Sequence, residues 1–397
     1  MLQKILLLTS WYPTTEMPQL GVFIKQQAEL LSQKFEVKVV VCNSKPIGRK
    51  KIIQDFSFSQ NTKYNQRISK SLDVINFGID DYVFLYDKLR FSILMYRYVS
   101  KLKELILSWK PDIIHAHDPW IAGVVANKIS IITKIPYVLT SHSPFAFYKA
   151  SQFVHKLIKE TISKTNQLIT VGYQDKRIYE SLLTLKNKPV VIGNYINTEI
   201  FNPKEKIKDK SQIFKITQIT RPFKIKDIPT FLKSISYFFN NYQVVQPIHI
   251  SLIISDVKQN SAIDLIKQEI NSLGLNNHIE IICNISNYEV AKQLASTNLY
   301  ISTSFYETFG ITVAEAIAMG IPTIVVDNGA ARDFVTDYEN GLLVEMEDYK
   351  KIAEYINKIY TKEIMFDENI MHQSIVSKYS KEKYLENLVS VYNKVFA

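Results

Sequence analysis

The sequence predicts an α/β protein with two tandem Rossmann-like, doubly wound domains, each a parallel sheet covered by helices. Its 397 residues exceed the usual size of one domain. Short apolar runs alternate with amphipathic stretches of helical length along the whole chain, as expected for strands joined by crossover helices. With 46% hydrophobic and 22% charged residues, the composition is globular and excludes a disordered or low-complexity chain.

The first half opens on an apolar run at 5–9, which is too short for a signal sequence or a membrane span and fits a buried strand. The next element is a helix that begins near Gly21, with Ile24, Ala28 and Leu31 on one face. Residues 45–70 have no clear period and suggest a long loop or insertion. The strands expected in this half are 5–9, 36–41, 73–77, 112–116, 136–140 and 167–171.

A strand that breaks into polar turn residues between Pro189 and Pro203 marks the domain boundary. The strands expected after it are 213–219, 248–254, 278–282, 299–302, 322–326 and 341–344, and a final helix covers 379–396. We therefore expect an N-terminal domain over 1–200 and a C-terminal domain over 201–375, with a cleft between them. The last segment, 376–397, is expected to pack back across the seam.

The two cysteines, Cys42 and Cys283, form no C-x-x-C pair, which excludes a disulfide framework and a thiolate zinc site. We expect both to be buried thiols in a reducing cytosol. The sequence also lacks the P-loop, G-x-G-x-x-G, H-E-x-x-H and G-x-S-x-G motifs. Kinase, simple dehydrogenase, zincin and α/β-hydrolase functions are therefore disfavoured.

The net charge of +10 is concentrated in the first half. Residues 1–200 hold 27 basic and 15 acidic side chains, a balance of +12, while the remainder holds 21 and 23, a balance of −2. This asymmetry suggests contact with a lipid headgroup, a phosphorylated acceptor or nucleic acid. Solvent-exposed lysines that bind no partner explain it equally well. The candidate cations are Arg49, Lys50 and Lys51, and Arg90, Arg97, Lys101 and Lys103 on one helix, which could equally pack into its own domain.

The segment 302–322 carries the most informative pattern. A strand ends in serine and threonine, and a loop with Glu307 leads through Gly310 into a short helix that contains Glu315. The free N–H groups at 310–312 suit a phosphate, and the two carboxylates suit the hydroxyls of a sugar and a ribose. The alternative is that Glu307 is a charge at a helix start and that Glu315 is an exposed helical residue.

Cations follow the first strand of the second half, where Arg221 and Lys226 lie at the carboxyl end of a predicted parallel strand. Ligands of open α/β sheets bind at such ends, and this pair of cations suits a diphosphate. Gly21 follows the first strand of the first half in the same way, and would let its loop approach the diphosphate from the other side of the cleft. Each of these residues also has a plain structural explanation, as a surface cation or a helix-start glycine.

Histidines end two further strands. His115 and His117 share one strand face and could begin a metal site, but no third ligand is evident, and ordinary strand-end histidines beside Asp118 are the stronger interpretation. His142 ends the next strand among small polar residues. It is placed to touch a polar substrate or, equally, to bond to the backbone.

Together these segments resemble the retaining glycosyltransferases of family 4, two-domain enzymes with the GT-B fold, and the resemblance covers nearly the whole chain. Its most specific part is Glu307 with Glu315 eight positions later, followed by the Arg221 and Lys226 pair and the Gly21 loop. The resemblance implies catalytic roles for Glu307, His142, Arg221 and Lys226. It implies donor binding by Gly21, Arg221, Lys226, Glu307, Phe309, Gly310, Ile311 and Glu315, without a metal or cofactor. One departure is Asp227, where a glycine usually follows the lysine.

The resemblance implies a retaining hexosyltransferase of class EC 2.4 that uses a nucleoside diphosphate sugar. We expect a lipid-linked or oligosaccharide acceptor in surface polysaccharide biosynthesis, and a cytoplasmic enzyme that contacts the anionic inner face of the plasma membrane peripherally. The alternative is a soluble transferase of glycogen, sucrose or trehalose metabolism. A nucleic-acid-binding protein is suggested by the basic charge alone, without an RNP-type aromatic pair or helix-turn-helix pattern, and a catalytically dead scaffold would not need the proposed groups.

Overall fold

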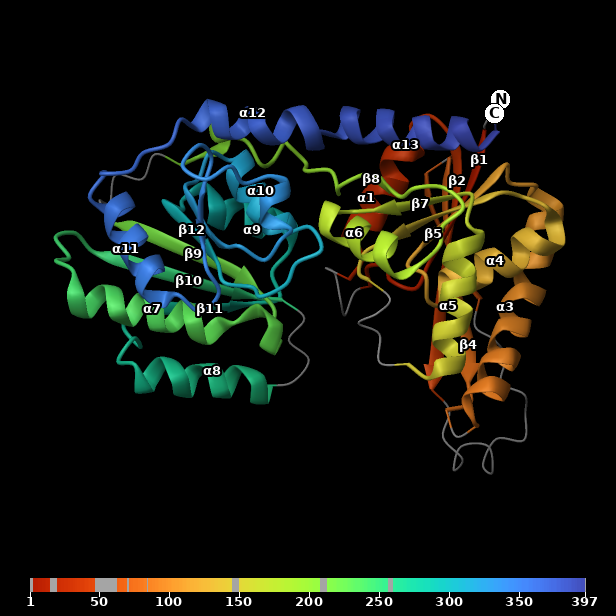
Figure 1. The fold of residues 1–397 in the computed structure, drawn as a ribbon, viewed down its shortest axis with the longest axis horizontal. Helices are drawn as coiled ribbons and strands as arrows, with labels where there is room; N and C mark the ends of the chain where they lie inside the picture. The colour runs from red at the N-terminus through yellow and green to blue at the C-terminus, as the bar shows by residue number, and fades with distance from the viewer. Residues whose placement is uncertain are drawn as a thin grey trace. The chain divides into compact units, whose positions relative to one another are not determined.

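The computed structural model describes residues 3–14, 20–46, 63–69, 71–83, 85–144, 150–207, 213–255 and 260–396. The chain divides into two units, each with its own sheet (Figure 1). Unit 1 comprises Met1–Thr15, Leu20–Gly193 and Leu385–Ala397, and unit 2 comprises Glu16–Gln19 and Asn194–Tyr384. The α/β class with two doubly wound sheets is confirmed.

Unit 1 contains an eight-stranded sheet in the order β3-β4-β2-β1-β5-β6-β7-β8. All neighbouring strands are parallel except β3 and β4. The strands are β1 (Lys4–Thr9), β2 (Glu36–Pro46), β3 (Lys63–Ser69), β4 (Leu72–Asp81), β5 (Ile113–His117), β6 (Tyr137–Ser141), β7 (Gln167–Thr170) and β8 (Val190–Val191). Every strand predicted in the first half is present, with ends that shift by a few residues.

The prediction of a loop over 45–70 is wrong at both ends. β2 continues to Pro46, and β3 is an edge strand that pairs antiparallel with β4. The β3 sequence, Lys-Tyr-Asn-Gln-Arg-Ile-Ser, has few apolar residues, so hydrophobic periodicity cannot reveal a strand that backbone pairing holds. Residues 47–62 and 70, which complete the predicted loop, lie outside the described residues.

Helices cover both faces of the unit 1 sheet. The central strand β5 shows this, since its side chains point alternately to the two faces. Ile114 and Ala116 join one buried cluster with α3 (Asp87–Trp109), α4 (Ile121–Thr133) and α5 (Gln152–Lys164). His115 points to the other face, toward α1 (Val22–Leu31) and the unit 1 part of α13 (Lys381–Phe396). The helix α6 (Tyr173–Leu182) follows β7.

Unit 2 contains a six-stranded parallel sheet in the order β11-β10-β9-β12-β13-β14. The strands are β9 (Phe214–Thr220), β10 (Ile248–Ile254), β11 (Ile279–Cys283), β12 (Leu299–Ser302), β13 (Thr323–Val326) and β14 (Leu342–Val344), and they agree closely with the prediction. Cys42 is buried as expected, but the prediction for Cys283 is wrong. Cys283 is exposed because it ends the edge strand β11, whose side chains are only partly covered.

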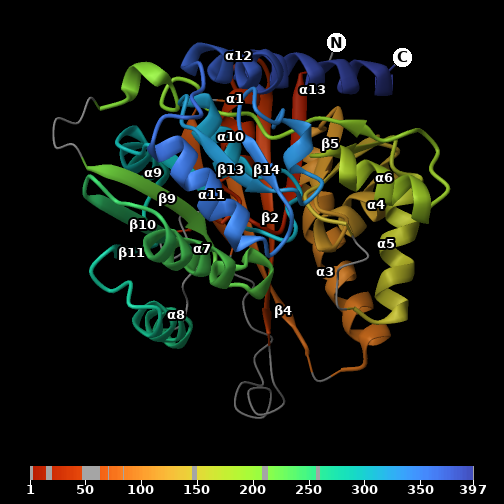
Figure 2. The ribbon, with the colours of Figure 1, turned by 60° about the vertical axis from the view of Figure 1, so that its left-hand side comes forward.

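One face of the unit 2 sheet packs against α7 (Ile228–Asn241), α8 (Asn260–Ser272) and α11 (Tyr349–Tyr360) in a single buried cluster (Figure 2). The opposite face carries α10 (Ile311–Ala318), because Tyr300 of β12 points away from that cluster and its hydroxyl bonds to Thr312. The remaining helices of the unit are α9 (Asn287–Ala295) and α12 (Glu368–Tyr379), and α12 packs against α10.

Each sheet has one switch point, where the chain leaves neighbouring strands in opposite directions. In unit 1 it lies between β1 and β5, and in unit 2 between β9 and β12. Open α/β sheets bind ligands outside the carboxyl ends of the strands at such points. Arg221 and Lys226 follow β9, and Glu307 follows β12. In unit 1 Gly21 comes after β1, whereas His142 follows β6, the neighbour of β5. Among the described residues, no helix is both long and apolar enough to cross a bilayer.

Candidate functional site

The loops after β9 and β12 are joined to each other at the unit 2 switch point. The backbone N–H of Phe305 donates to the Ile225 carbonyl at 2.9 Å. The Thr303 hydroxyl donates to the Asp227 carbonyl at 2.8 Å and accepts from the Gln218 amide at 2.9 Å. Buried side chains therefore fix both loops, and the charged residues that they carry, in one arrangement.

An ion pair connects the two loops. The Lys226 ammonium donates to Oε1 of Glu307 at 2.5 Å, although 81 residues separate the two in the sequence. Their side chains are only 17% and 21% exposed, so the pair is shielded from bulk water without being closed off. The structure therefore brings together two of the predicted catalytic residues, and Arg221 leaves β9 in the same loop as Lys226.

Gly310 caps the start of α10 with φ of 89°, a left-handed conformation that favours glycine. A Cβ at this position would lie 3.2 Å from Cζ of Phe334, so a side chain would have to displace that ring. Phe309 is buried against the rings of Phe334 and Tyr379. Phe309 can therefore support donor binding only by holding the loop, while Ile311 begins the helix and contributes its backbone N–H.

Glu315 is buried in α10, and this burial raises the pKa of its carboxyl to about 8. At neutral pH the group therefore holds a proton, and it can donate a hydrogen bond as well as accept one. Sequence reasoning treated Glu315 as a carboxylate that only accepts. Burial of the carboxyl is the cause, and the adjacent residues Ala314 and Ala316 are fully buried as well.

Asp227, the departure from the usual glycine, has φ of 47° and therefore the left-handed backbone that glycine adopts readily. Its carboxylate accepts from the Thr230 N–H at 3.3 Å and caps α7. Burial raises the pKa of this carboxyl. The substitution thus keeps the loop geometry and adds a helix cap.

The unit 1 switch point brings Gly21 and His142 near each other through aromatic side chains. Gly21 has φ of 65°, and a Cβ there would lie 2.5 Å from the Trp11 carbonyl oxygen, so the loop after β1 requires glycine. Phe23, two residues later, packs on the His142 ring with 4.5 Å between ring centroids. The ring of Trp11 lies 6.4 Å from His142.

His115, His117 and His142 form a stack of three rings, which we call the histidine ladder. Adjacent centroids are 4.5 Å and 5.3 Å apart. Desolvation lowers the pKa of His115 and His142 to about 3, and that of His117 well below its usual value, so all three are neutral at pH 7. No group of three or more His, Cys, Asp or Glu in the described part of the chain is arranged to hold a metal ion.

Two residues of this region escaped sequence reasoning. The Gln27 amide contacts Nδ1 of His115 at 3.2 Å, and the Tyr392 hydroxyl lies 2.7 Å from the same nitrogen. Gln27 occupies the buried face of α1, where a polar residue breaks the apolar pattern and offered a signal. Tyr392 lies 277 residues from His115, and no local pattern could link them.

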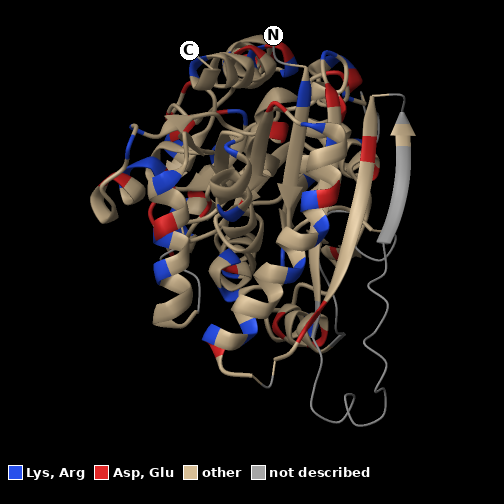
Figure 3. Cartoon of the chain, turned by 90° about the vertical axis from the view of Figure 1, so that its right-hand side faces the viewer, with Lys and Arg blue, Asp and Glu red and all other residues tan. Residues whose placement is uncertain are grey.

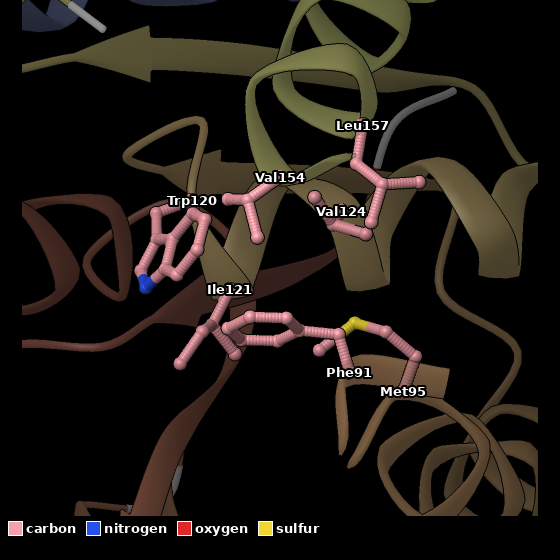
Figure 4. Close-up of a pocket in the computed structure, with 7 residues that line it drawn as sticks. All are labelled: Phe91, Met95, Trp120, Ile121, Val124, Val154 and Leu157. Atoms are coloured by element: carbon pink, nitrogen blue, oxygen red, sulfur yellow. The ribbon is translucent and has the colours of Figure 1, made fainter. Parts of the chain in front are cut away.

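A small pocket in unit 1 lies between the N-terminal turns of α3, α4 and α5 (Figure 4). All of its lining side chains are apolar or aromatic: Phe91, Met95, Trp120, Ile121, Val124, Val154 and Leu157. Its volume of about 10 Å³ is close to the space that one water molecule needs, so the pocket is a packing gap between the helices and not a ligand site.

The candidate membrane-contact cations on α3 mostly form interactions within unit 1. Arg90 forms a two-pronged ion pair with Asp81, with both N–O distances 2.6 Å. Arg97 bonds to the Tyr82 hydroxyl at 2.9 Å, and Lys101 lies over the ring of Phe77. Lys103 is exposed, whereas Arg49, Lys50 and Lys51 lie outside the described residues. Lysine and arginine are spread over several helices with acidic residues among them (Figure 3).

Two family models match the chain in sequence. Residues 21–200 match the model described as Glycosyltransferase Family 4, and residues 198–393 match the model described as Glycosyl transferases group 1. One relative is the alpha-monoglucosyldiacylglycerol synthase of Acholeplasma laidlawii. It is 23% identical over 76% of this chain and 79% of its own length.

Solved structures share the fold over nearly the whole chain. The sucrose-phosphate synthase of Thermosynechococcus elongatus has a TM-score of 0.78 at 16% identity, and the match covers 99% of both chains. Anabaena HepE in complex with UDP-glucose has a TM-score of 0.72 at 17% identity, and the match covers 98% of this chain and 99% of the other. The predicted resemblance is confirmed: the chain belongs to the GT-B glycosyltransferases of the family 4 type, and is a transferase of class EC 2.4.

Proposed function

We propose that the enzyme transfers a hexose, with retention of configuration, from a nucleoside diphosphate sugar to a lipid-linked or oligosaccharide acceptor in surface polysaccharide biosynthesis. The observation that carries the donor assignment is the 2.5 Å pair between Lys226 and Glu307, which joins the two loops of the unit 2 switch point. The HepE structure contains UDP-glucose, which supports a donor of this class.

In this proposal, Arg221 and Lys226 neutralise the diphosphate, whose charge grows as the bond to the sugar breaks. The N–H groups at the start of α10 are the natural partners of a phosphate oxygen, with Gly310 allowing close approach. Glu307 binds the transferred sugar, and Glu315 binds the ribose through its protonated carboxyl. When the donor arrives, Lys226 exchanges part of its contact with Glu307 for the phosphate.

His142 is proposed to contact the sugars through a hydrogen bond. Its low pKa means that the ring acts as a neutral group and not as a cation near the reaction. Gly21 would allow the loop after β1 to approach the diphosphate closely. None of these assigned roles requires a metal ion or a cofactor.

Two observations support a lipid-linked acceptor. Residues 1–200 carry a balance of +12, and a relative is a diacylglycerol glycolipid synthase by name. On this basis we propose that the enzyme works in the cytoplasm at the inner face of the plasma membrane. The second candidate, a soluble transferase acting on small sugars, is favoured by the high structural similarity to sucrose-phosphate synthase.

The test is a transfer assay with a panel of nucleoside diphosphate hexoses against a short-chain lipid-linked sugar, sucrose precursors and glycogen. We expect product only with the lipid-linked or oligosaccharide acceptors, and NMR of the new anomeric centre should show the configuration of the donor. Transfer only to small soluble sugars would support the second candidate. An inverted product would refute retention.

A further inference from the structure

A hydrogen bond links two rungs of the histidine ladder. Nδ1 of His117 lies 3.0 Å from Nε2 of His142, and their rings are within 14° of parallel. His117 is fully buried, whereas His142 at the end of β6 is partly exposed. The exposed ring, to which a substrate role is assigned above, is therefore held by a ring that no substrate reaches.

The neutral state of the ladder limits how this bond can form. Each neutral ring has one N–H and one bare nitrogen, so two arrangements are possible. Either His117 donates from Nδ1 and His142 accepts at Nε2, or His142 donates and His117 accepts. The first arrangement places the single proton of His142 on Nδ1, and the second leaves Nδ1 bare.

The other nitrogen of His117 favours the first arrangement. Nε2 of His117 is buried and has no hydrogen-bond partner in the described part of the chain. If His142 donated, the one proton of His117 would lie on this nitrogen as a buried N–H without an acceptor, which native proteins rarely tolerate. If His117 donates, the buried nitrogen keeps only a lone pair.

The base of the ladder prevents His117 from turning away. Nδ1 of His115 faces the amide nitrogen of Gln27 at 3.2 Å, and this nitrogen can only donate. The proton of His115 therefore lies on Nε2 and is donated to the Thr140 hydroxyl at 2.7 Å. The Tyr392 hydroxyl lies 2.7 Å from the same Nδ1 atom of His115. His115 is thus fixed from three elements, and His117 stacks on it at 4.5 Å.

We propose that His117 is a positioning residue that fixes the ring of His142 and holds it in the Nδ1–H tautomer, so that His142 offers a hydrogen-bond donor to a substrate oxygen. The inference rests on the role of His142 in the proposed function. The tautomer itself is a property of the free protein and can be measured whether or not transfer is observed.

The direct test is long-range ¹H–¹⁵N NMR of the histidine rings in the full-length, uniformly ¹⁵N-labelled protein, with His142 assigned from its loss in a His142→Gln variant. We expect the His142 couplings of an Nδ1–H ring, and in His117→Leu a mixture or reversal of the two tautomers. A wild-type His142 that is protonated at Nε2 would overturn the inference.

Kinetics separate positioning from a merely structural role. His117→Leu should lower kcat by about 10-fold, the cost of one hydrogen bond, with little change in KM for the donor. His117→Asn, whose amide can replace the Nδ1–H donor, should restore kcat to within about threefold. His249→Leu, which removes a half-exposed histidine of unit 2, is the control and should leave kcat unchanged.

If His117→Leu does not fold, the wild-type NMR result and the His117→Asn variant still decide the matter. Equal losses of kcat in His117→Leu and His117→Asn at unchanged melting temperature would contradict a role for the donated hydrogen bond. A correct tautomer in a protein that transfers no sugar would refute the proposed function and leave the ladder geometry standing.

Discussion

The two switch points have the same topology and opposite chemistry. In unit 2 the loops after β9 and β12 meet through an ion pair, Lys226 with Glu307, beside Arg221. In unit 1 the strands β1 and β5 end among neutral rings, with Phe23 on His142 and His142 bonded to His117. Desolvation lowers the pKa values of the three histidines, so their rings are uncharged at neutral pH.

Under the proposed function, this contrast divides the work of the transferase between the two units. Fixed charges recognise a charged leaving group, because they stabilise the negative charge that develops when the diphosphate departs. Neutral rings and hydrogen bonds recognise sugar hydroxyls, which carry no charge. The contrast also gives the two regions different responses to mutation, pH and salt.

Loss of the Glu307 carboxylate should have the largest effect. Glu307→Gln keeps the size of the side chain but removes the charge, and turnover should fall by about 100-fold or more at an unchanged melting temperature. The measurement is kcat on the best donor, with Glu339→Gln, an exposed glutamate of unit 2, as the matched control. Near-normal turnover would remove Glu307 from the reaction.

The next effect concerns the two cations. Arg221→Ala and Lys226→Ala should each weaken binding of a nucleoside diphosphate by about 10-fold, because each removes one charged contact to the same phosphates. The double variant should weaken binding by about 30-fold, which is less than the roughly 100-fold product of the two single effects, because the effects of residues that share a partner are not additive. Strict additivity in a calorimetric titration would place the two cations at separate sites.

The pH response of Glu315 separates the two units. Its folded pKa of about 8 exceeds the value of about 4.5 for an unburied carboxyl, so the folded state binds more protons between these values and loses stability as pH rises. Glu315→Gln should remove this loss, which these pKa values put at about 3 to 4 kcal/mol between pH 5 and pH 8. Urea unfolding at several pH values measures it.

The histidine ladder should respond in the opposite direction. The lowered pKa values of its histidines mean that the unfolded state binds more protons, so the ladder contributes a loss of stability as pH falls from about 6.5 toward 3.

A Glu315→Gln variant whose pH dependence of stability matches that of the wild type between pH 5 and pH 8 would contradict the buried, protonated carboxyl of Glu315.

The smallest effect concerns the membrane. Binding to anionic vesicles should exceed binding to neutral ones and should weaken at 1 M salt, where the Debye length falls to about 3 Å. Lys103→Ala should reduce it by about fivefold, the value of one cation near a charged surface, and Lys267→Ala on α8 of unit 2 should not. Equal binding to both vesicle types would remove the electrostatic contact.

Much of the fold was predictable because buried parallel strands are short apolar runs, and β1, β10 and β12 each appear as one. Two features of the fold could not be predicted from the sequence, for physical reasons. β3 is an edge strand of mainly polar sequence, and Cys283 ends an edge strand that leaves its thiol exposed. Apolar periodicity reports burial, and these residues depend on their position in the sheet.

The same limit applies to the site. Glu307, Lys226 and Gly310 were predictable because strand ends and helix starts are visible in the sequence. The proton on Glu315 depends on the packing around α10, and the ladder depends on Tyr392 from the far end of the chain. A sequence pattern cannot supply either, because both arise from residues that meet only in the folded unit.

The central claim is that the unit 2 loops bind the diphosphate of a nucleotide sugar, and ligand-dependent melting tests it most directly. A nucleoside diphosphate or its sugar, at about 100 times its dissociation constant, should stabilise the wild type by about 2.7 kcal/mol, and the nucleoside alone should not. Lys226→Ala, with about 10-fold weaker binding, should be stabilised by only about 1.4 kcal/mol at the same ligand concentration. An unchanged melting temperature with every diphosphate ligand, or full stabilisation of Lys226→Ala, would contradict the account.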